Sequence, residues 1–316
     1  MKILLTTRLP IEGFAALSNY TIEMPMNAQF SHDELAEKIA DCDVLVPTFD
    51  YRIDSELIAK AERLKLIANF GAGFNNIDLA AAKKRGIIVT NTPDPVIKPT
   101  AEQTFTLLLA CAHRTAELDR KMRQTDEIKI GVMNNLGIGI SGKTLGIVGM
   151  GRIGRAVAQR AVAFGMNIVY HNRHKLPDET EQKCHARYVG FDELLQTADF
   201  VVLLLPYTPE THHLIDENAF AKMKRGAVLV NTARGAIVDE AALVANLKNG
   251  RLWGAALDVF EFEPHISDAL KHLDNLVMSP HIGTGTIDGR LAMSRCVAQN
   301  IVHFATGAHA QMNVVG

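Results

Sequence analysis

Three residues in the second half of the chain together supply a cation, a carboxylate and an imidazole. They are Arg234 in LVNTARGAIVDE, Glu263 in GAALDVFEFEP and His281 in MSPHIG. A permanently charged arginine can hold a carboxylate and polarise a keto oxygen beside it. A protonated histidine can pass its proton to the alkoxide that forms when a ketone accepts hydride, and a neighbouring carboxylate stabilises that protonated form. These residue types therefore suit the reduction of a ketone that carries a carboxylate.

Each of these residues also has a structural interpretation when it is taken singly. Arg234 could be a surface loop residue, His281 could be structural, and Glu263 before Pro264 could belong to a turn. Their positions favour chemistry, because Arg234 and His281 directly follow apolar runs and Glu263 lies in the loop after the run between them. In open α/β sheets, ligands bind where the strands end.

A glycine-rich loop indicates where the hydride would come from. The segment TLGIVGMGRIGRAVAQRAVAFG contains Gly149, Gly151 and Gly154 between an apolar run and an alanine-rich helical stretch. In that context the first glycine permits a tight turn, the second lets the backbone approach a pyrophosphate, and the third lets helix and strand pack closely. The pyrophosphate would lie at the helix N-terminus, beside Arg152 and Ile153. The alternative is a plain turn between a strand and a helix, and the context favours a dinucleotide site.

The next strand predicts which dinucleotide is used. In NAD-binding folds of this kind an Asp or Glu usually ends the second strand and accepts hydrogen bonds from the ribose hydroxyls. Here NIVYH is followed by Asn172 and Arg173, and the next acid, Asp178, lies beyond a proline. An arginine fork matches a phosphate group, so we expect NADPH to be preferred, with NAD possible. The alternative is a solvated Arg173 with loose coenzyme selectivity.

Short β-rich runs alternate with helix-like segments along nearly the whole chain. Because the runs are apolar on both faces, they predict parallel sheets covered by helices on each side. The alternation itself predicts a doubly wound α/β architecture, and 316 residues accommodate two such domains with a boundary near residue 100. The runs expected to be strands are 2–7, 44–48, 64–70, 86–91, 144–149, 167–171, 200–206, 227–233, 253–259 and 276–280.

Three helix-like segments have recognisable starts or faces. The first, 31–41, opens with a serine–glutamate capping pair at Ser31. The second is a single long helix at about 100–122 that is expected to be capped at Thr100. The third, about 286–306, is amphipathic and follows the last strand.

The composition is that of an ordinary globular protein, with 47% apolar and 22% charged residues. A formal net charge of −2 gives no reason to expect nucleic acid or an anionic membrane as a partner. The longest apolar stretch, about 105–112, is too short to span a bilayer, and the N-terminal MKILLTTRLP does not match a signal peptide. The four cysteines are widely spaced, as in reduced cytoplasmic proteins, and the adjacent His212 and His213 lack metal-ligand spacing. We therefore expect a cytoplasmic protein with no metal.

Further motifs complete an ordered series. They are GAGFNNID at 71–78, TAE at 100–102, the glycine loop, LPYTPET at 205–211 and the three segments that carry the Arg, Glu and His. Across about residues 40–285 the chain resembles the D-isomer-specific 2-hydroxyacid dehydrogenase family, and within it the glyoxylate/hydroxypyruvate reductases. The resemblance implies an enzyme that reduces glyoxylate, hydroxypyruvate or a related small 2-ketoacid to a D-2-hydroxy acid.

The resemblance also implies roles for individual residues. Arg234, Glu263 and His281 would be the catalytic trio, and the substrate carboxylate would be held by Arg234 and by the backbone N–H groups of Ala72 and Gly73. The residues expected to contact the coenzyme are Gly149, Gly151, Arg152, Ile153, Gly154, Asn172, Arg173, Pro206, Thr211, Thr232, Asp258 and Gly283.

The family's organisation implies a split domain and a dimer. A Rossmann coenzyme domain, 100–285, would be inserted in a flavodoxin-like substrate domain made of 1–99 and 286–316. The long helix from Thr100 looks like the family's dimer helix, which implies a homodimer. The segment 124–141 departs from the family because it lacks a tryptophan that is often present there.

Two other functions fit the same motifs. One is 3-phosphoglycerate dehydrogenase, which the NADP-like strand end disfavours, and the other is a dinucleotide-sensing corepressor that retains the trio. Formate dehydrogenase fits less well, because relatives with that activity replace the glutamate that is present here as Glu263. The substrate side chain is also open, since four aromatic residues either line its pocket or pack in the core. These are Phe49, Tyr51, Phe70 and Phe74.

Overall fold

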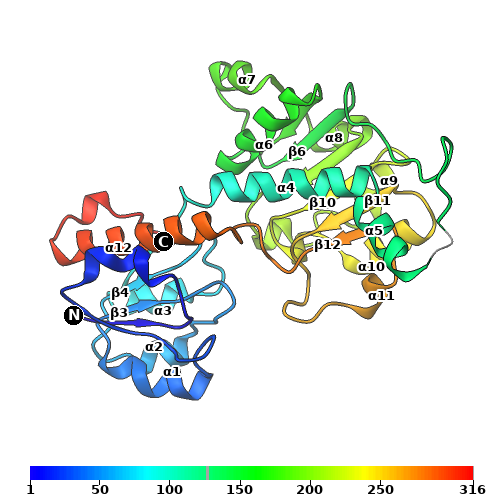
Figure 1. The fold of residues 1–316 in the computed structure, drawn as a ribbon. Coiled ribbons are helices and arrows are strands. Elements are labelled where there is room, and N and C mark those ends of the chain that lie inside the picture. Colours follow the sequence, from blue (N-terminus) through cyan, green and yellow to red (C-terminus); the bar gives the residue numbers. More distant parts are fainter. Residues whose placement is uncertain (126–127, 316) are drawn as a thin grey trace. The chain divides into compact units, whose positions relative to one another are not determined.

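The computed structural model describes residues 1–125 and 128–315, and the chain divides into two compact units (Figure 1). The first unit is Met1–Val96 together with the segment from Thr284 onward, and the second unit is Ile97–Gly283. These breaks lie beside the expected boundaries at 99/100 and 285/286, and the roles assigned to the two domains stay predictions. Within the described residues, no helix is long and apolar enough to cross a membrane.

The first unit is built on a parallel sheet of five strands in the order β2-β1-β3-β4-β5. This is the flavodoxin-like order, in which the chain moves outward from β1 in both directions. The central strands β3 and β4 are fully buried, which is why they read as uninterrupted apolar runs. The strand bounds are β1 Lys2–Leu5, β2 Thr21–Glu23, β3 Val44–Val46, β4 Leu66–Ala68 and β5 Ile88–Thr90.

Helices cover both faces of this sheet. Figure 1 shows α12 along one face and α1 and α2 on the other, and α12 packs against η1 and β4. The capping pair expected at the start of α1 is confirmed, because Ser31 Oγ accepts from Glu34 N–H and the Glu34 carboxylate accepts from Ser31 N–H. At the start of α12, the Thr286 hydroxyl accepts from Gly289 N–H at 3.0 Å. The helices are α1 His32–Lys38, α2 Ser55–Lys60, α3 Leu79–Lys84 and α12 Ile287–Ala305, with short 3-10 turns η1 Ile11–Leu17, η2 Ile39–Asp41 and η5 His309–Gln311.

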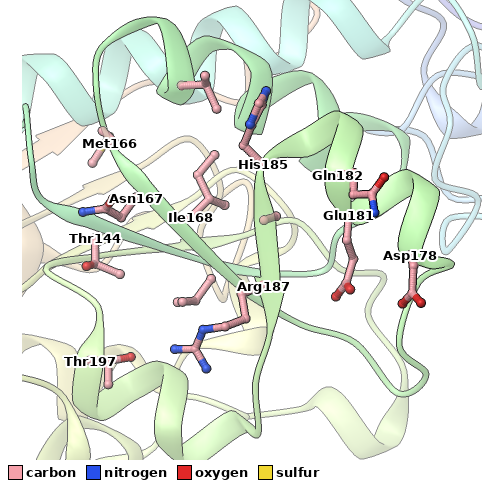
Figure 2. Close-up of a pocket in the computed structure, with 13 residues that line it drawn as sticks. Thr144, Met166, Asn167, Ile168, Asp178, Glu181, Gln182, His185, Arg187 and Thr197 are labelled. Atoms are coloured by element: carbon pink, nitrogen blue, oxygen red, sulfur yellow. The ribbon is translucent and has the colours of Figure 1, made fainter.

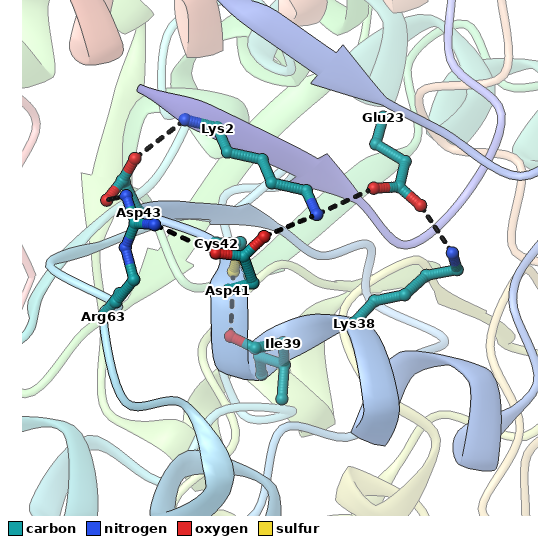
Figure 3. A network of polar contacts seen from close by, with 8 residues as sticks. All are labelled: Lys2, Glu23, Lys38, Ile39, Asp41, Cys42, Asp43 and Arg63. Atoms are coloured by element: carbon teal, nitrogen blue, oxygen red, sulfur yellow. Dashed lines mark hydrogen bonds and ion pairs between the residues drawn. The ribbon is translucent and has the colours of Figure 1, made fainter.

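A network of ion pairs lies at the amino ends of β1 and β3 in the first unit (Figure 3). Lys2 pairs with Glu23 and Asp41, and Arg63 pairs with Asp41 and Asp43, with N···O distances of 2.9–3.3 Å. Partly exposed pairs of this kind contribute about 0–1 kcal/mol each. Since ligands of parallel sheets bind at the opposite, carboxyl edge, we assign this network a structural role.

The second unit contains a seven-stranded parallel sheet in the order β12-β11-β10-β9-β6-β7-β8. The chain runs from β6 outward to β7 and β8, and then returns to build β9 to β12 on the other side. The strand order therefore reverses between β6 and β9, the place where doubly wound sheets bind their ligands. The strand bounds are β6 Thr144–Val148, β7 Asn167–His171, β8 Ala186–Tyr188, β9 Phe200–Leu203, β10 Val228–Asn231, β11 Gly254–Leu257 and β12 Leu276–Met278.

Two apolar cores lie on the two faces of this second sheet. On one face α4 and α6 pack through residues such as Phe105 and Val157, and on the other α8, α9 and α10 pack through Leu194, Phe220 and Leu243. The predicted doubly wound α/β fold is confirmed. The helices are α4 Ile97–Ala112, α5 Thr115–Gln124, α6 Arg152–Ala163, α7 Asp178–Cys184, α8 Phe191–Thr197, α9 Glu217–Lys222, α10 Glu240–Lys248 and α11 Asp268–Lys271, with 3-10 turns η3 Pro209–Thr211 and η4 Gly235–Ile237.

The expectation of one helix over 100–122, capped at Thr100, is wrong. Helix α4 begins three residues earlier, at Ile97, because Pro99 falls in its first turn, where a missing N–H costs no helical hydrogen bond. The helix ends at Ala112, and Arg114 takes a left-handed conformation with φ 57° before α5 begins. Arg114 is held there by two hydrogen bonds to the buried carboxylate of Glu117, at 2.8 and 2.7 Å.

Two short strands, β2 and β8, were not anticipated. Each has three residues and lies at an edge of its sheet, and each is partly exposed. An edge strand of this kind carries no apolar run, so its pattern resembles that of a loop.

Candidate active site

The residues expected to bind coenzyme or act in catalysis all follow the carboxyl ends of strands in the second unit. Because the strands are parallel, those ends lie along one edge of the sheet. The loops that follow the strands carry Gly149–Gly154 after β6, Asn172 and Arg173 after β7, Pro206 and Thr211 after β9, Thr232 and Arg234 after β10, Asp258 and Glu263 after β11, and His281 and Gly283 after β12.

The glycine loop after β6 has the geometry of a phosphate-binding turn. Gly149 has φ 100°, and a Cβ there would lie 2.6 Å from the carbonyl carbon of Leu204. A Cβ on Gly154 would lie 2.5 Å from Gly149 O, so only glycine lets α6 approach the turn this closely. Gly151, at the N-cap of α6, has no atom within 4 Å of its Cβ position. The first and third glycines therefore serve the fold, whereas the second leaves room at the helix N-terminus for the pyrophosphate of a dinucleotide.

Asn172 is tied to this loop. Its side-chain oxygen accepts a hydrogen bond from Met150 N–H at 2.7 Å, which leaves the amide NH₂ group as its donor. Arg173 is exposed. Glu210 lies close enough to Arg173 for the two charges to interact, since the pKa of Glu210 is lowered first by hydrogen bonding to Thr208 and to a smaller extent by Arg173. The next acid, Asp178, pairs with Lys175 at 2.7 Å.

Three other predicted coenzyme contacts take part in hydrogen bonds within the second unit. Thr211 Oγ1 accepts from Thr208 N–H at 2.7 Å and donates to Pro206 O at 3.1 Å. The Thr232 hydroxyl shares a 2.7 Å hydrogen bond with Thr104 of α4. These bonds shape the loops, and contact between these residues and the coenzyme stays a prediction.

Asp258 organises the loop that carries the histidine. It is 1% exposed, and its carboxylate accepts from Ser279 Oγ at 2.6 Å and from the N–H groups of Ile282 and Gly283 at 2.9 and 2.7 Å. Its backbone carbonyl accepts from His281 N–H at 2.8 Å. These bonds hold His281 at φ 51°, a conformation that few residues other than glycine adopt. Burial raises the pKa of Asp258 although these hydrogen bonds oppose the change.

The structure brings the predicted trio together. His281 Nδ1 lies 2.8 Å from Glu263 Oε2, and the other carboxylate oxygen of Glu263 accepts from Phe260 N–H at 2.8 Å. Burial acts to raise the pKa of Glu263, but its hydrogen bond and attraction to His281, with smaller effects of Phe260 and Arg234, leave that pKa below its usual range. A charged carboxylate is thus held against the imidazole.

Arg234 is placed beside this pair by close packing of two loops. Asn231 donates to Arg234 O at 2.9 Å and accepts from Ala233 N–H at 3.0 Å, which fixes the turn after β10. A Cβ on Gly235 would lie 1.9 Å from the carbonyl carbon of Phe260, so this turn lies directly against the loop that carries the glutamate. Burial lowers the pKa of Arg234 and the negative charge of Glu263 opposes the change. Arginine remains protonated under such conditions.

A further set of residues braces the glutamate loop and was missed in the sequence. His213 Nε2 lies 2.6 Å from Glu261 Oε1, Glu261 N–H donates to Glu240 Oε1 at 2.7 Å, and Glu240 N–H donates back to Glu261 Oε2 at 3.2 Å. Glu240 is 5% exposed, and burial raises its pKa. The sequence feature that could have indicated this role is Glu240 in VDEAAL, but an acid at this place is also typical of an ordinary helix start.

In the first unit, the loop after β4 contains Ala72 and Gly73. Asn69 donates to Gly73 O at 2.8 Å and Asn91 donates to Ala72 O at 2.8 Å. Within residues 1–125 and 128–315 the N–H groups of Ala72 and Gly73 have no hydrogen-bond partner. A pair of unpartnered N–H groups in one turn suits an anion such as a carboxylate.

Two of the four aromatic residues considered for a substrate pocket belong to the core. Tyr51 is 6% exposed and donates to Ser31 O at 3.0 Å, and Phe70 is 1% exposed. Phe49 and Phe74 are partly exposed, and Phe74 packs against the first unit's core.

A large open cleft of about 1010 Å³ lies elsewhere in the second unit (Figure 2). It is lined by residues such as Thr144, Asn167 and Arg187, at the amino ends of β6, β7 and β8. It therefore lies at the edge opposite the glycine loop, where parallel sheets do not usually bind ligands. Among the described residues no three His, Cys, Asp or Glu side chains are grouped so that they could hold a metal ion.

Comparison with known proteins agrees with this geometry. Residues 105–283 match the family model described as "D-isomer specific 2-hydroxyacid dehydrogenase, NAD binding domain". The chain belongs to this family. It is 43% identical over 312 residues to the glyoxylate reductase of Thermococcus onnurineus, covering 97% of this chain and 93% of that protein. This member of the 2-hydroxyacid dehydrogenases is therefore an NAD(P)-dependent, glyoxylate reductase-like enzyme, as the sequence predicts.

Solved structures of two other proteins are similar over the whole of this dehydrogenase. One is the NADPH-dependent glyoxylate/hydroxypyruvate reductase of Sinorhizobium meliloti in complex with NADP and malonate, with 28% identity, a TM-score of 0.86 and 96% of that chain covered. The other is the D-lactate dehydrogenase of Aquifex aeolicus with NAD and lactic acid, with 28% identity, a TM-score of 0.85 and 99% of that chain covered. The fold thus occurs with either coenzyme.

The glycine loop of the dehydrogenase yields a matched pair of variants. Gly149→Ala should lower the free energy of unfolding by about 2 kcal/mol, because the new Cβ meets the Leu204 backbone at a φ that alanine disfavours. Gly151→Ala should unfold like wild type but bind coenzyme roughly tenfold more weakly, a cost of about 1.4 kcal/mol. Denaturant unfolding and titration of coenzyme fluorescence measure the two effects. Equal losses of stability in both variants would contradict the assignment of Gly151 to the coenzyme.

Proposed function

We propose that this enzyme is an NADPH-preferring reductase of glyoxylate, hydroxypyruvate or a related small 2-ketoacid, and that its product is the D-2-hydroxy acid. The observation that carries the proposal is the 2.8 Å contact between His281 and a charged Glu263, with Arg234 in the adjoining turn. The similarity to glyoxylate reductases supports the same substrate class.

The site residues would share three tasks: they bind the coenzyme and the substrate, polarise the keto oxygen, and protonate that oxygen. The bound nicotinamide coenzyme supplies the hydride, and Gly151 with the N-terminus of α6 would hold its pyrophosphate. Arg234 binds the substrate and polarises its keto oxygen, so that negative charge developing there is stabilised. His281 gives a proton to that oxygen through the ring nitrogen not bonded to Glu263, and it takes the proton back when the hydroxy acid is oxidised. We assign the N–H groups of Ala72 and Gly73 to the substrate carboxylate.

A panel of 2-ketoacids of increasing size, assayed with NADPH and NADH, tests the function and the coenzyme together. We expect the highest kcat/KM with glyoxylate or hydroxypyruvate and NADPH. The panel should include oxidation of 3-phosphoglycerate, the substrate of the alternative dehydrogenase. Faster turnover of 3-phosphoglycerate would replace the proposed substrate, and no turnover of any compound would favour a dinucleotide-sensing protein.

The coenzyme preference is assigned to Arg173, with Asn172 beside it. Arg173→Ala should weaken NADPH binding roughly ten- to a hundredfold, because a charge-assisted contact contributes about 1.5–3 kcal/mol, while NADH binding should change little. Arg187→Ala is a matched control. Arg187 is also exposed and pairs with Glu193 at 3.0 Å, but it lies in β8, away from the glycine loop. Equal losses for the two coenzymes would remove Arg173 from the 2′-phosphate site.

Removing the charge of Glu263 tests the pair of Glu263 and His281. Burial acts to raise the pKa of Glu263, but its 2.8 Å hydrogen bond and its attraction to His281 leave that pKa below its usual range, so the carboxylate stays charged at neutral pH. Glu263→Gln nearly keeps the shape and removes the charge, so kcat for both reduction and oxidation should fall roughly tenfold to a hundredfold. A primary deuterium isotope effect must first show that hydride transfer limits the rate, and an unchanged kcat would mean that the pair does not act together.

We also propose a homodimer that uses the exposed apolar side chains after α5. Ile130, Val132 and Met133 are 96%, 94% and 78% exposed, a concentration that favours a protein partner. Part of the expected dimer segment, residues 126–127, lies outside the described residues. Light scattering should give twice the mass of one chain, and Val132→Asp should give the mass of one chain with an unchanged far-UV circular dichroism spectrum. A monomeric wild type would refute the dimer.

We further propose a cytoplasmic location. All four cysteines are free thiols, and burial raises the pKa of Cys42 and Cys111 to about 12. Thiols of this kind suit a reducing compartment, and cell fractionation tests the assignment.

A further inference from the structure

Three asparagines, two of them buried, connect the C-terminal segment with the loop of Ala72 and Gly73. Asn91 donates from its side chain to Ala72 O at 2.8 Å. Asn300 of α12 donates to Asn91 O at 3.1 Å. The same Asn300 side chain accepts from Asn313 N–H at 3.0 Å. We call Asn91, Asn300 and Asn313 the asparagine chain.

The C-terminal segment is laid along β5 to complete this chain. Asn91 N–H donates to Asn313 O at 3.0 Å, and Val315 N–H donates to Val89 O at 2.9 Å. Thr90 and Val314 form an antiparallel bridge between these two bonds. Asn91 is therefore held at its N–H, at its carbonyl and at its side chain, each by a different part of the first unit.

The consequence for the loop is a fixed direction of its carbonyl groups. Gly71 O accepts from Thr92 N–H at 3.0 Å, Ala72 O accepts from Asn91, and Gly73 O accepts from Asn69 at 2.8 Å. Three successive peptide groups are thus bound through their oxygens, and a planar peptide whose C=O is fixed has its N–H fixed as well. Asn69, Asn91 and Asn300 are 0%, 8% and 2% exposed, so water does not replace these donors readily.

We propose that the asparagine chain is a positioning device for the substrate carboxylate, with Asn91 as its key residue. Held by Asn300 and by the C-terminal segment, Asn91 binds Ala72 O and so keeps the N–H group of Gly73, in the same peptide, aimed at a carboxylate without touching the substrate. Thr92 N–H, next to Asn91 in the chain, holds Gly71 O and so fixes the N–H group of Ala72. This inference rests on the proposed function, because it assigns a substrate carboxylate to that loop. The inference extends the proposed function by making Asn300 of α12 and residues 313–315 determinants of substrate binding.

A purely structural role would have a different signature. If the asparagines only stabilise the first unit, their replacement lowers the melting temperature and leaves the kinetics of the folded enzyme unchanged. If they position the loop, KM for the carboxylate substrate rises while kcat and coenzyme binding stay close to wild type. The N–H groups of a loosened loop also exchange faster with solvent deuterium.

The experiment compares Asn91→Leu and Asn300→Leu with wild type and with Asn246→Leu in the full-length protein. Leucine has a shape close to that of asparagine and cannot donate a hydrogen bond. Asn246 is the matched control, since it is 1% exposed and donates to Ala242 O and Glu217 at 2.9 Å within the second unit. The measurements are KM and kcat for glyoxylate with NADPH, the Kd of NADPH, the melting temperature, and deuterium uptake of the peptide covering 69–76.

We expect KM for glyoxylate to rise roughly fivefold to tenfold in Asn91→Leu, as for loss of one hydrogen bond, and by a smaller factor in Asn300→Leu. The kcat should stay within about twofold of wild type, the Kd of NADPH should not change, and peptide 69–76 should take up deuterium faster. Asn246→Leu should lower only the melting temperature. Unchanged KM and unchanged uptake in both first-unit variants would overturn the inference while leaving the proposed function intact.

Failure of the proposed function has its own outcome. If wild type reduces none of the 2-ketoacids, oxamate is titrated into the NADPH complex as a carboxylate probe that cannot be reduced. Weaker oxamate binding by Asn91→Leu than by wild type would uphold the inference without the proposed activity. A wild type that binds no oxamate would overturn both.

Discussion

Parallel pairing is the constraint on which the rest of the molecule depends. In a sheet whose strands all run in one direction, every strand ends at the same edge, so loops far apart in the sequence are gathered there. In the second unit this brings together the turn after β6 and the turns after β10, β11 and β12, which span residues 149 to 283. The trio could not be assembled from an antiparallel meander of the same elements, because alternate strands would end at opposite edges.

Loops gathered at one edge create a second requirement. Their backbone N–H and C=O groups have no hydrogen-bond partners in a neighbouring strand and must find them elsewhere. Buried polar side chains meet it here. Asp258 accepts from Ile282 and Gly283, Asn231 bonds both sides of the turn that carries Arg234, and Glu240 and Glu261 bond one another's backbone. A buried group left without such a partner costs about 1–3 kcal/mol, so these side chains determine where Arg234, Glu263 and His281 lie. They belong to the candidate site as much as the residues proposed to carry out the chemistry.

The sequence predicts the features that depend on local patterns. A strand buried on both faces is a continuous apolar run that stops at the first polar residue of the following loop. The runs therefore predict the central strands, and the residues at their ends include Arg234 and His281. The break between α4 and α5 could not be read, because it depends on a left-handed Arg114 held by a buried Glu117, and neither residue is a helix breaker. The asparagine chain was invisible for a related reason. Its members lie up to 222 residues apart, and each alone looks like an ordinary asparagine.

The end of β7 shows how fold and selectivity can be separated at a single position. Asn172 accepts a hydrogen bond from Met150 N–H through its side-chain oxygen, and an aspartate of the same shape could accept that bond equally well. The glycine turn therefore needs an acceptor at position 172 and is indifferent to its charge. A carboxylate there would repel a phosphate, whereas a neutral amide retains the acceptor and adds an NH₂ donor beside the exposed Arg173. Because the fold does not require a particular charge at this position, the proposed preference for NADPH can be set there without a change in the glycine turn.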